Sequence, residues 1–551
     1  MSAPAAPGAP ARPLRGRSAR RPGAASGAGH LVRSALRRDR ALIAVWAAVT
    51  VGVVLGGVAA AETTYPTAQD RQDRWEQLQS VPMFVLFQSR AFADTAEALA
   101  VQQAFAGGTM CAALGAILLV VRGTRAEESS GRRELLGGLP LGRHADLAAA
   151  LAVALGSGAA LGALIACGLI VSGMPVAGSV ALGLVTAMAV WTGAGTAALA
   201  AQLTSGPGRA VGLAFGAFYL LHLIRGLGAM AGGDALRLTW VTPQGSWENL
   251  RSFADEQWWA LLPALIWIVL TVAAAFALAD RRDLGAGLLP QRPGRVRGAG
   301  WLRSVPALTW RLDRVPLAGW AVAVAVTGLA MGYVGAGAMA EYADMPWVRG
   351  MGAELGVAPA DTFFTYVVFV FVFPVAAQAL FTALRIRREE TSGTAELLLS
   401  GPTGRTAWAL AHAGAALAAP VALLAVLGVS VGLGSGLGGG QLWADVARFT
   451  GLTLSLAPAV WVVVGVAVLA QGLVPRLSTA VGWTALGAGI VTEIAVKTGL
   501  IPELLFLLLS PFAHVNPYYQ GSVITYPALT ALAAALVAAG VWALRRRDLP
   551  V

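Results

Sequence analysis

Long apolar stretches dominate this sequence, and each is long enough to cross a lipid bilayer. A hydrocarbon core needs roughly 20 apolar residues in helical form, and runs of about this length recur along the 551 residues. Lipid offers the backbone no hydrogen-bond partners, so a spanning segment must be a helix or a strand of a closed barrel. The alternating strands of a barrel are absent. We therefore predict an all-α polytopic membrane protein.

The apolar stretches predict twelve transmembrane helices in two sets of six. The first set lies near residues 41–61, 99–121, 146–172, 176–202, 211–230 and 259–279. The second set lies near residues 316–336, 363–384, 407–434, 450–474, 480–500 and 524–544. The chain then divides into a disordered basic cytoplasmic tail (1–30), a first transmembrane half (31–290), a cytoplasmic linker (291–307) and a second transmembrane half (308–551).

The arginines predict the orientation of these helices. They gather in the tail, in the linker, at the end of the chain and in two segments inside the halves, while the intervening loops carry mostly acids. By the positive-inside rule both termini are cytoplasmic, in a bacterial plasma membrane. The net charge of +11 is thus assigned to cytoplasmic arginine and not to nucleic-acid binding. Tryptophans near predicted span ends are expected to be interfacial anchors: Trp240, Trp247, Trp258, Trp259, Trp301, Trp310 and Trp347.

One charged segment occurs twice, once in each half. Arg125–Arg143, the first island, and Arg387–Arg405, the second island, share eleven of nineteen aligned residues, and each follows span two of its half. Shorter matches flank them, such as Arg281–Leu284 with Arg546–Leu549 and Ala201–Gln202 with Ala470–Gln471. With six spans per half, both halves have the same orientation, so we expect parallel repeats related by an axis along the membrane normal.

Each island has the composition of a bend followed by a short helix. Gly131 and Gly393 permit the bend, and Pro140 and Pro402 end the element. Such a helix along the cytoplasmic face would present a glutamate to a partner and be anchored by the Leu pair after it: Leu135–Leu136 and Leu397–Leu398. The alternative is a solvated turn whose acids offset nearby arginines.

The islands carry a resemblance to permease subunits of ABC-2 type exporters, which have a cytoplasmic loop with acids, a Gly and a Glu-Leu pair ahead of a Pro between spans two and three. The fused, double-length form resembles actinobacterial polyketide- or tetronasin-type antibiotic exporter permeases. The resemblance implies that this loop forms a coupling helix that docks on an ATPase subunit. It carries over to Glu127, Glu128, Gly131, Glu134, Glu389, Glu390, Gly393 and Glu396. The islands differ where Arg132–Arg133 is replaced by Thr394–Ala395.

The chain has no sequence that would bind ATP. A P-loop needs a Lys after its second Gly, and the only Lys, Lys497, follows Val496. We therefore expect no enzyme activity and no cofactor in this chain, with ATP and magnesium on a separate ABC ATPase subunit. The two islands imply two copies of that subunit, or two different ones. No metal-ligand or nucleophile motif is present, and Cys111 and Cys167 suggest isolated thiols within spans.

Polar and aromatic residues inside the spans are candidates for a transport path, because ionisable groups in lipid are costly. The candidates are Gln103, Phe105, Phe218, Tyr219, His222, Phe364, Tyr366, Glu493 and Lys497. Glu493 and Lys497, four apart, can pair on one helix face. The alternatives are plain helix packing for the aromatics and snorkelling to water for the charged groups.

These expectations describe an ATP-driven exporter permease that moves an amphipathic or hydrophobic small molecule outward by alternating access. The alternative is a proton-coupled secondary transporter of the major facilitator type, also twelve spans in two parallel halves. Its loop after span two carries an Asp-Arg pair. Here Gly131-Arg132-Arg133 is present and the Asp-Arg pair is missing.

Overall fold

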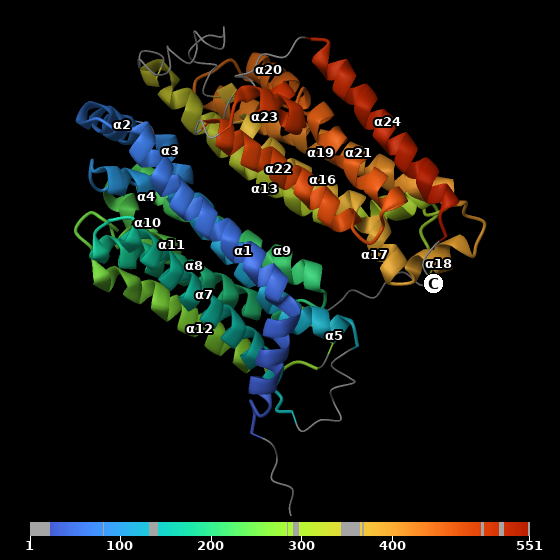
Figure 1. The fold of residues 1–551 in the computed structure, drawn as a ribbon, viewed down its shortest axis with the longest axis horizontal. Coiled ribbons are helices and arrows are strands. Elements are labelled where there is room, and N and C mark those ends of the chain that lie inside the picture. Colours follow the sequence, from blue (N-terminus) through green and yellow to red (C-terminus); the bar gives the residue numbers. More distant parts are fainter. Residues whose placement is uncertain are drawn as a thin grey trace, which may run out of the picture. The chain divides into compact units, whose positions relative to one another are not determined.

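Every regular element that the computed structural model describes is a helix (Figure 1). The described residues are 23–80, 82–131, 141–283, 285–289, 297–342, 364–365, 368–497, 501–516 and 523–548. The elements of the first half are α1 (Ala28–Thr64), α2 (Ala68–Ser80), α3 (Pro82–Phe87), α4 (Ala96–Val121), η1 (Arg122–Ala126), α5 (Glu127–Ser129), α7 (Ala145–Val171), α8 (Val176–Leu203), α9 (Pro207–Ala231), η2 (Gly233–Leu236), α10 (Arg237–Val241), α11 (Pro243–Glu248), η3 (Trp258–Leu261) and α12 (Leu262–Ala279). Those of the second half are α13 (Val305–Tyr342), α16 (Val372–Ala383), α17 (Arg385–Thr391), α18 (Thr394–Leu399), α19 (Arg405–Leu437), α20 (Leu442–Leu454), α21 (Ala457–Leu473), α22 (Ser478–Lys497), α23 (Glu503–Leu509), η4 (Pro511–Val515) and α24 (Thr525–Arg546).

Twelve helical stretches in the described residues are long and apolar enough to cross a membrane, and each coincides with a predicted span. The all-α membrane fold is therefore confirmed. The main differences lie at the helix starts. The first helix begins at Ala28 and the seventh at Val305, each more than ten residues before the predicted span. The residues added are rich in arginine, which the apolar pattern cannot detect but which has good helix propensity.

The chain forms two compact units. Unit 1 holds residues 1–56, 107–221 and 241–291, and in it α8 packs against both α7 and α12. Unit 2 holds residues 57–106, 222–240 and 292–551, and in it α13 lies beside α19 and α21 beside α24. The parallel relation of the two sequence halves remains a prediction.

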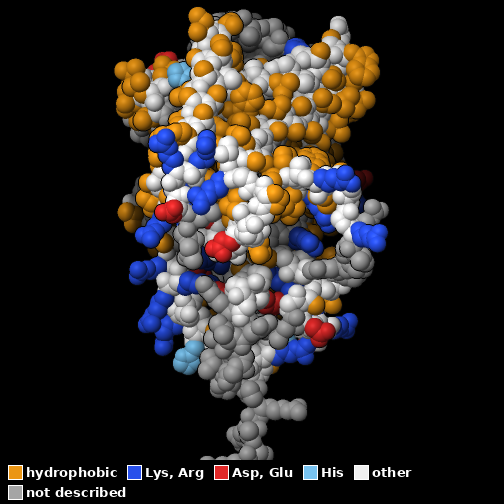
Figure 2. Space-filling view, turned by 90° about the vertical axis from the view of Figure 1, so that its right-hand side faces the viewer, with side chains coloured by type: hydrophobic (Ala, Val, Ile, Leu, Met, Phe, Trp, Pro, Cys, Tyr) orange, Lys and Arg blue, Asp and Glu red, His pale blue; other side chains and the backbone are white. Residues whose placement is uncertain are grey.

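Helix α12 illustrates how a span divides its surface between protein and lipid. Its buried residues recur at helical spacing and face α8, for example Ala264, Ile268 and Thr271. Its exposed residues are large and apolar and recur on the opposite face: Leu262, Leu265, Ile266, Val269 and Leu270. A broad apolar surface is also visible in Figure 2, with arginine side chains gathered outside it. In water such a surface would favour aggregation, whereas in a bilayer it is the face that contacts lipid.

Glycines allow the closest helix crossings, as is common in membrane proteins. Gly162 of α7 and Gly183 of α8 face each other in unit 1, where a Cβ on either would lie within 2.5 Å of the other's carbonyl oxygen. In unit 2, α21 and α24 approach in the same way at Gly472 and Gly540. Small side chains at these points let backbone pack against backbone and set the distance between the helices.

We expect Gly162→Ala to destabilise the protein by about 1–3 kcal/mol, because the new methyl group must push α7 and α8 apart. Gly156→Ala is the matched control. It lies on the same helix with no atom within 4 Å of its added methyl group, so the higher helix propensity of Ala should leave stability equal or raise it by up to ~1 kcal/mol. Unfolding in mixed micelles, followed by circular dichroism, measures both. Equal stability for the two variants would contradict the close crossing.

Candidate functional site

The first island begins where span two changes its helical geometry. The last turn of α4 widens into the π-helix η1, and α5 follows directly. Irregular turns of this kind are frequent at functional sites. Arg125, in η1, is fully buried and donates hydrogen bonds to the carbonyl oxygens of Ala201 and Ala286, the latter at 2.9 Å. The first residue of the island is thus a buried arginine that contacts the end of α8 and the segment after α12.

Glu128 ties this island to the end of span six. Its carboxylate accepts from Arg125 at 2.8 Å and from Arg282 at 2.5 Å, and its side chain is only 5% exposed. Arg282 also donates to the side-chain oxygen of Gln202 at 2.6 Å. A buried carboxylate with two guanidinium partners is a constrained structural group, because removing one member leaves an uncompensated charge.

The second island repeats this arrangement within unit 2. Glu390, 2% exposed, accepts from Arg387 at 3.4 Å and from Arg547, which follows the last span. Arg387 and Arg547 are the repeat counterparts of Arg125 and Arg282. We call each set of two arginines and one glutamate an island clamp. Both clamps join the loop after span two to the chain that follows span six of the same half.

The last residue of each island makes a second connection to the same place. Arg143 donates to the carbonyl oxygen of Asp280 at 2.6 Å, and Arg405 donates to that of Arg547 at 3.0 Å. These carbonyls lie at or just after the C-terminal ends of α12 and α24, where carbonyl groups lack helical partners and cations are favourable. Both ends of each island are therefore attached to the end of span six.

The first acid of each island has different partners in the two halves. Glu127 forms an ion pair with Arg38 of α1. Glu389 instead accepts from His412 at 3.1 Å and from the indole of Trp408 at 2.9 Å, both on α19. The sequence difference between the islands therefore extends to how they are held.

The bend and short helix predicted for the islands are present in the second copy. Gly393 has φ +72°, the left-handed conformation that favours Gly, and it precedes α18. In that helix Ala395 is buried, Glu396 is exposed and Leu397 is 77% exposed. Leu398 packs on the core while Leu397 does not, so only one of the two leucines anchors the helix.

In the first copy, Gly131 also has a positive φ, of +71°. Residues 132–140 lie outside the described part of the chain, and with them Glu134. The island acids therefore differ in what they offer a partner. Glu128 and Glu390 are enclosed in the clamps, Glu127 and Glu389 are partly exposed, and Glu396 is exposed. Their coupling role remains a prediction.

Three of the aromatic candidates for a transport path are packed within the two units: Phe105, Phe218 and Phe364. The guanidinium carbon of Arg225 lies 5.8 Å from the centre of the Phe105 ring. Phe364 packs on Phe449. Phe218 is buried against Trp247; that tryptophan is only 1% exposed, so its predicted interfacial position is wrong. Sequence spacing alone does not separate a tryptophan near a span end from one that folds back into the core.

Of the polar candidates in spans two and five, His222 makes a structural contact within the described part of the chain and Gln103 does not. Gln103 faces outward, whereas the neighbouring Gln102 is buried and donates to the side chain of Gln88 at 2.6 Å. His222 is hydrogen-bonded through Nε2 to the carbonyl oxygen of Phe87 at 3.1 Å. Arg225 donates to the carbonyl oxygen of Leu86 at 3.0 Å. These contacts satisfy the carbonyl end of α3, as cations commonly do at a helix C-terminus.

Span eleven repeats this use of a polar side chain. Glu493 accepts from Asn516 at 2.8 Å, and so holds the segment after η4. The side chains of Tyr366 and Lys497 lie outside the described part of the chain, and Tyr219 is half-buried. Their proposed place on a transport path, and that of the other candidates, stays a prediction.

Sequence reasoning missed Arg282 and Arg547 as part of the site. A signal for them was present, since the Arg-Arg-Asp-Leu match at the end of each half repeats as clearly as the islands do. His412 and Trp408 left no such signal, because the corresponding first-half positions hold other residues. Among the described residues no group of His, Cys, Asp or Glu is placed to hold a metal ion.

Twelve apolar helices in the described residues indicate a multi-pass membrane protein. The chain is 33% identical over 543 residues, 98% of both sequences, to the multidrug efflux system permease protein Rv1217c of Mycobacterium tuberculosis. Residues 302–545 match the family described as the C-terminal domain of multidrug efflux system permease Rv1217c. The chain therefore belongs to the family of this permease.

Proposed function

We propose that this chain is the membrane subunit of an ATP-driven drug exporter of the ABC-2 type, in double-length form. It moves amphipathic or hydrophobic small molecules, antibiotics among them, outward across a bacterial plasma membrane. ATP and magnesium are bound by a separate ABC ATPase subunit, in two copies that dock on the two islands. The observation that carries the proposal is the duplicated island clamp, together with full-length similarity to a multidrug efflux permease.

The clamps suit a loop that receives force from a partner. Both ends of an island are bonded to the end of span six, and its start continues directly from span two. Displacement of the loop must therefore carry the ends of these two spans in the same half. ATP-driven closure of two docked subunits would move both islands and switch the cavity between inward and outward access.

The lack of a P-loop in this sequence supports a partner as the energy source. The only Lys, Lys497, stands in no P-loop. On the predicted orientation both islands, the linker and both termini are cytoplasmic, where a soluble ATPase reaches them.

Transport by reconstituted vesicles tests the proposal. The full chain is placed in liposomes with and without a candidate ABC ATPase partner, and movement of the lipophilic dye rhodamine 6G is followed. We expect transport only with ATP and the ATPase, and none with an ATPase whose catalytic Glu is replaced by Gln. Transport by the chain alone, driven by an imposed proton gradient, would overturn the proposal and favour the secondary transporter.

A further inference from the structure

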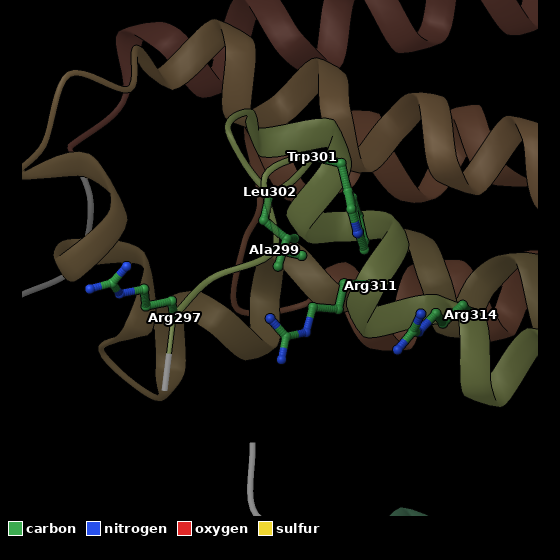
Figure 3. A pocket seen from close by; sticks show the side chains of 6 residues that line it. All are labelled: Arg297, Ala299, Trp301, Leu302, Arg311 and Arg314. Carbon is green, nitrogen blue, oxygen red and sulfur yellow. The ribbon is translucent and has the colours of Figure 1, made fainter. Parts of the chain in front are cut away.

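A basic cavity lies where the linker meets the first helix of the second half. It has a volume of about 360 Å³, within the range of small-molecule sites, and is lined by Arg297, Ala299, Trp301, Leu302, Arg311 and Arg314. Figure 3 shows that Arg311 and Arg314 come from α13, while Trp301 and Leu302 come from the segment just before it. The residues all belong to unit 2.

The three arginines bring positive charge without a compensating acid. Arg297, Arg311 and Arg314 are exposed, and none forms an ion pair with a described residue. The nearest acid in sequence, Asp313, is already paired with Arg385 at 2.7 Å. Arg311 and Arg314 are three residues apart on α13, so they lie on one side of the helix, and their guanidinium groups fit a phosphate, which accepts bidentate hydrogen bonds from arginine. The side chain of Arg297 points away from these two in Figure 3.

The cavity opens beside an apolar track on the same helix. Exposed apolar side chains follow Arg311 along α13: Val315, Val322, Val326, Leu329 and Tyr333. At 3.6 residues per turn these positions and Arg311 fall within an arc of about 60°. Trp301 and Trp310, 49% and 54% exposed, lie at the polar end of this track. That is the position of tryptophan at the level of lipid headgroups.

We propose that this cavity binds an anionic phospholipid, with its phosphate at Arg311 and Arg314 and its acyl chains along the exposed face of α13. A free phosphate ion shares the headgroup chemistry, but it would make no use of the apolar track. The leaflet is the one at the start of α13, which the arginine distribution predicts to be cytoplasmic. The inference does not depend on what the permease exports.

The first half provides a matched control. Arg37 and Arg40, at the start of α1, align with Arg311 and Arg314 and are likewise exposed. The position that aligns with Trp301 is Gly27. A double alanine variant of either pair removes two charges, but only the second-half variant alters the cavity.

The test measures binding of fluorescent phosphatidylglycerol to the purified full chain in neutral micelles. We expect Arg311→Ala/Arg314→Ala to weaken binding about thirtyfold, at roughly 1 kcal/mol per arginine near a lipid surface and 1.4 kcal/mol per tenfold. Arg37→Ala/Arg40→Ala should change the affinity for the lipid less than about threefold, which corresponds to roughly 0.7 kcal/mol. Trp301→Ala should weaken it as well, and phosphatidylcholine should bind more weakly than phosphatidylglycerol.

Three outcomes would overturn the inference. Equal losses in the two double variants would mean diffuse attraction and not a site. Full competition by millimolar inorganic phosphate would identify a free-anion site. Equal binding of the neutral and anionic lipids would exclude recognition of charge. Because the substituted side chains are exposed, the variants should fold, and size-exclusion profiles together with thermal unfolding verify this.

Discussion

Replacing Glu128 by Ala is expected to destabilise the protein by about 3–5 kcal/mol, the usual cost of breaking a buried ion pair by removing one partner. The variant leaves Arg125, with no exposed side-chain area, and Arg282, 8% exposed, without their carboxylate. Both remain charged, because a guanidinium does not lose its proton in a protein. Titration with sodium dodecyl sulfate in mixed micelles, followed by circular dichroism, gives the change in unfolding free energy.

Two further variants test whether the loss of the buried ion pair is what destabilises Glu128→Ala. Glu396→Ala removes an exposed acid from the second island and should change stability by less than about 0.5 kcal/mol. Glu128→Leu combined with Arg125→Met and Arg282→Met replaces all three charged side chains by apolar ones, and such replacements are often neutral or stabilising. We therefore expect this triple variant to be more stable than Glu128→Ala. A loss of less than about 1 kcal/mol in Glu128→Ala would show that the clamp is not a buried ion pair of the usual kind.

If the proposed function is correct, reversing the charge of one acid in each island should uncouple the permease from the proposed ATPase. In Glu134→Lys/Glu396→Lys, attraction to the partner is replaced by repulsion, and like charges across an interface cost several kcal/mol. We expect stimulation of ATP hydrolysis by the permease to fall at least about tenfold, which corresponds to roughly 1.4 kcal/mol of coupling. Hydrolysis is measured in liposomes that contain the permease and the ATPase, with and without rhodamine 6G.

The control variant carries the same change of charge in two predicted outer loops, away from the islands. Asp94 and Asp234 are exposed acids in predicted outer loops, so Asp94→Lys/Asp234→Lys should leave ATP hydrolysis and its stimulation unchanged. Glu396 is exposed, and its substitution should not affect folding, which thermal unfolding confirms independently. Normal stimulation in the island variant would exclude these two acids as docking residues.

The sequence was sufficient to predict the membrane-spanning helices, because a run of apolar residues is a local feature of the chain. Twenty apolar residues must span a bilayer wherever they occur, so the twelve predicted spans all correspond to helices. The bends at Gly131 and Gly393 were also predictable, because only Gly adopts a positive φ at low cost.

The clamp partners were not predictable, since they depend on contacts between segments far apart in the chain. Glu128 meets Arg282 across 154 residues, and no periodicity reports such a contact. The same holds for Pro316 in α13, which cannot donate a hydrogen bond to the carbonyl of Leu312. Arg385 donates to that carbonyl at 3.5 Å, so a side chain distant in sequence supplies the hydrogen bond that the proline cannot.

Helix α18 has only six residues, far below the length at which a helix is stable by itself in water. Its order depends on the left-handed Gly393 before it and on the packing of Ala395 and Leu398 on the core. Leu397 adds nothing to this order while it is exposed to water. Any partner that covers Leu397 therefore contributes directly to the folding equilibrium of the helix. By thermodynamic linkage, backbone amides of α18 should exchange their hydrogens more slowly as the partner's affinity rises.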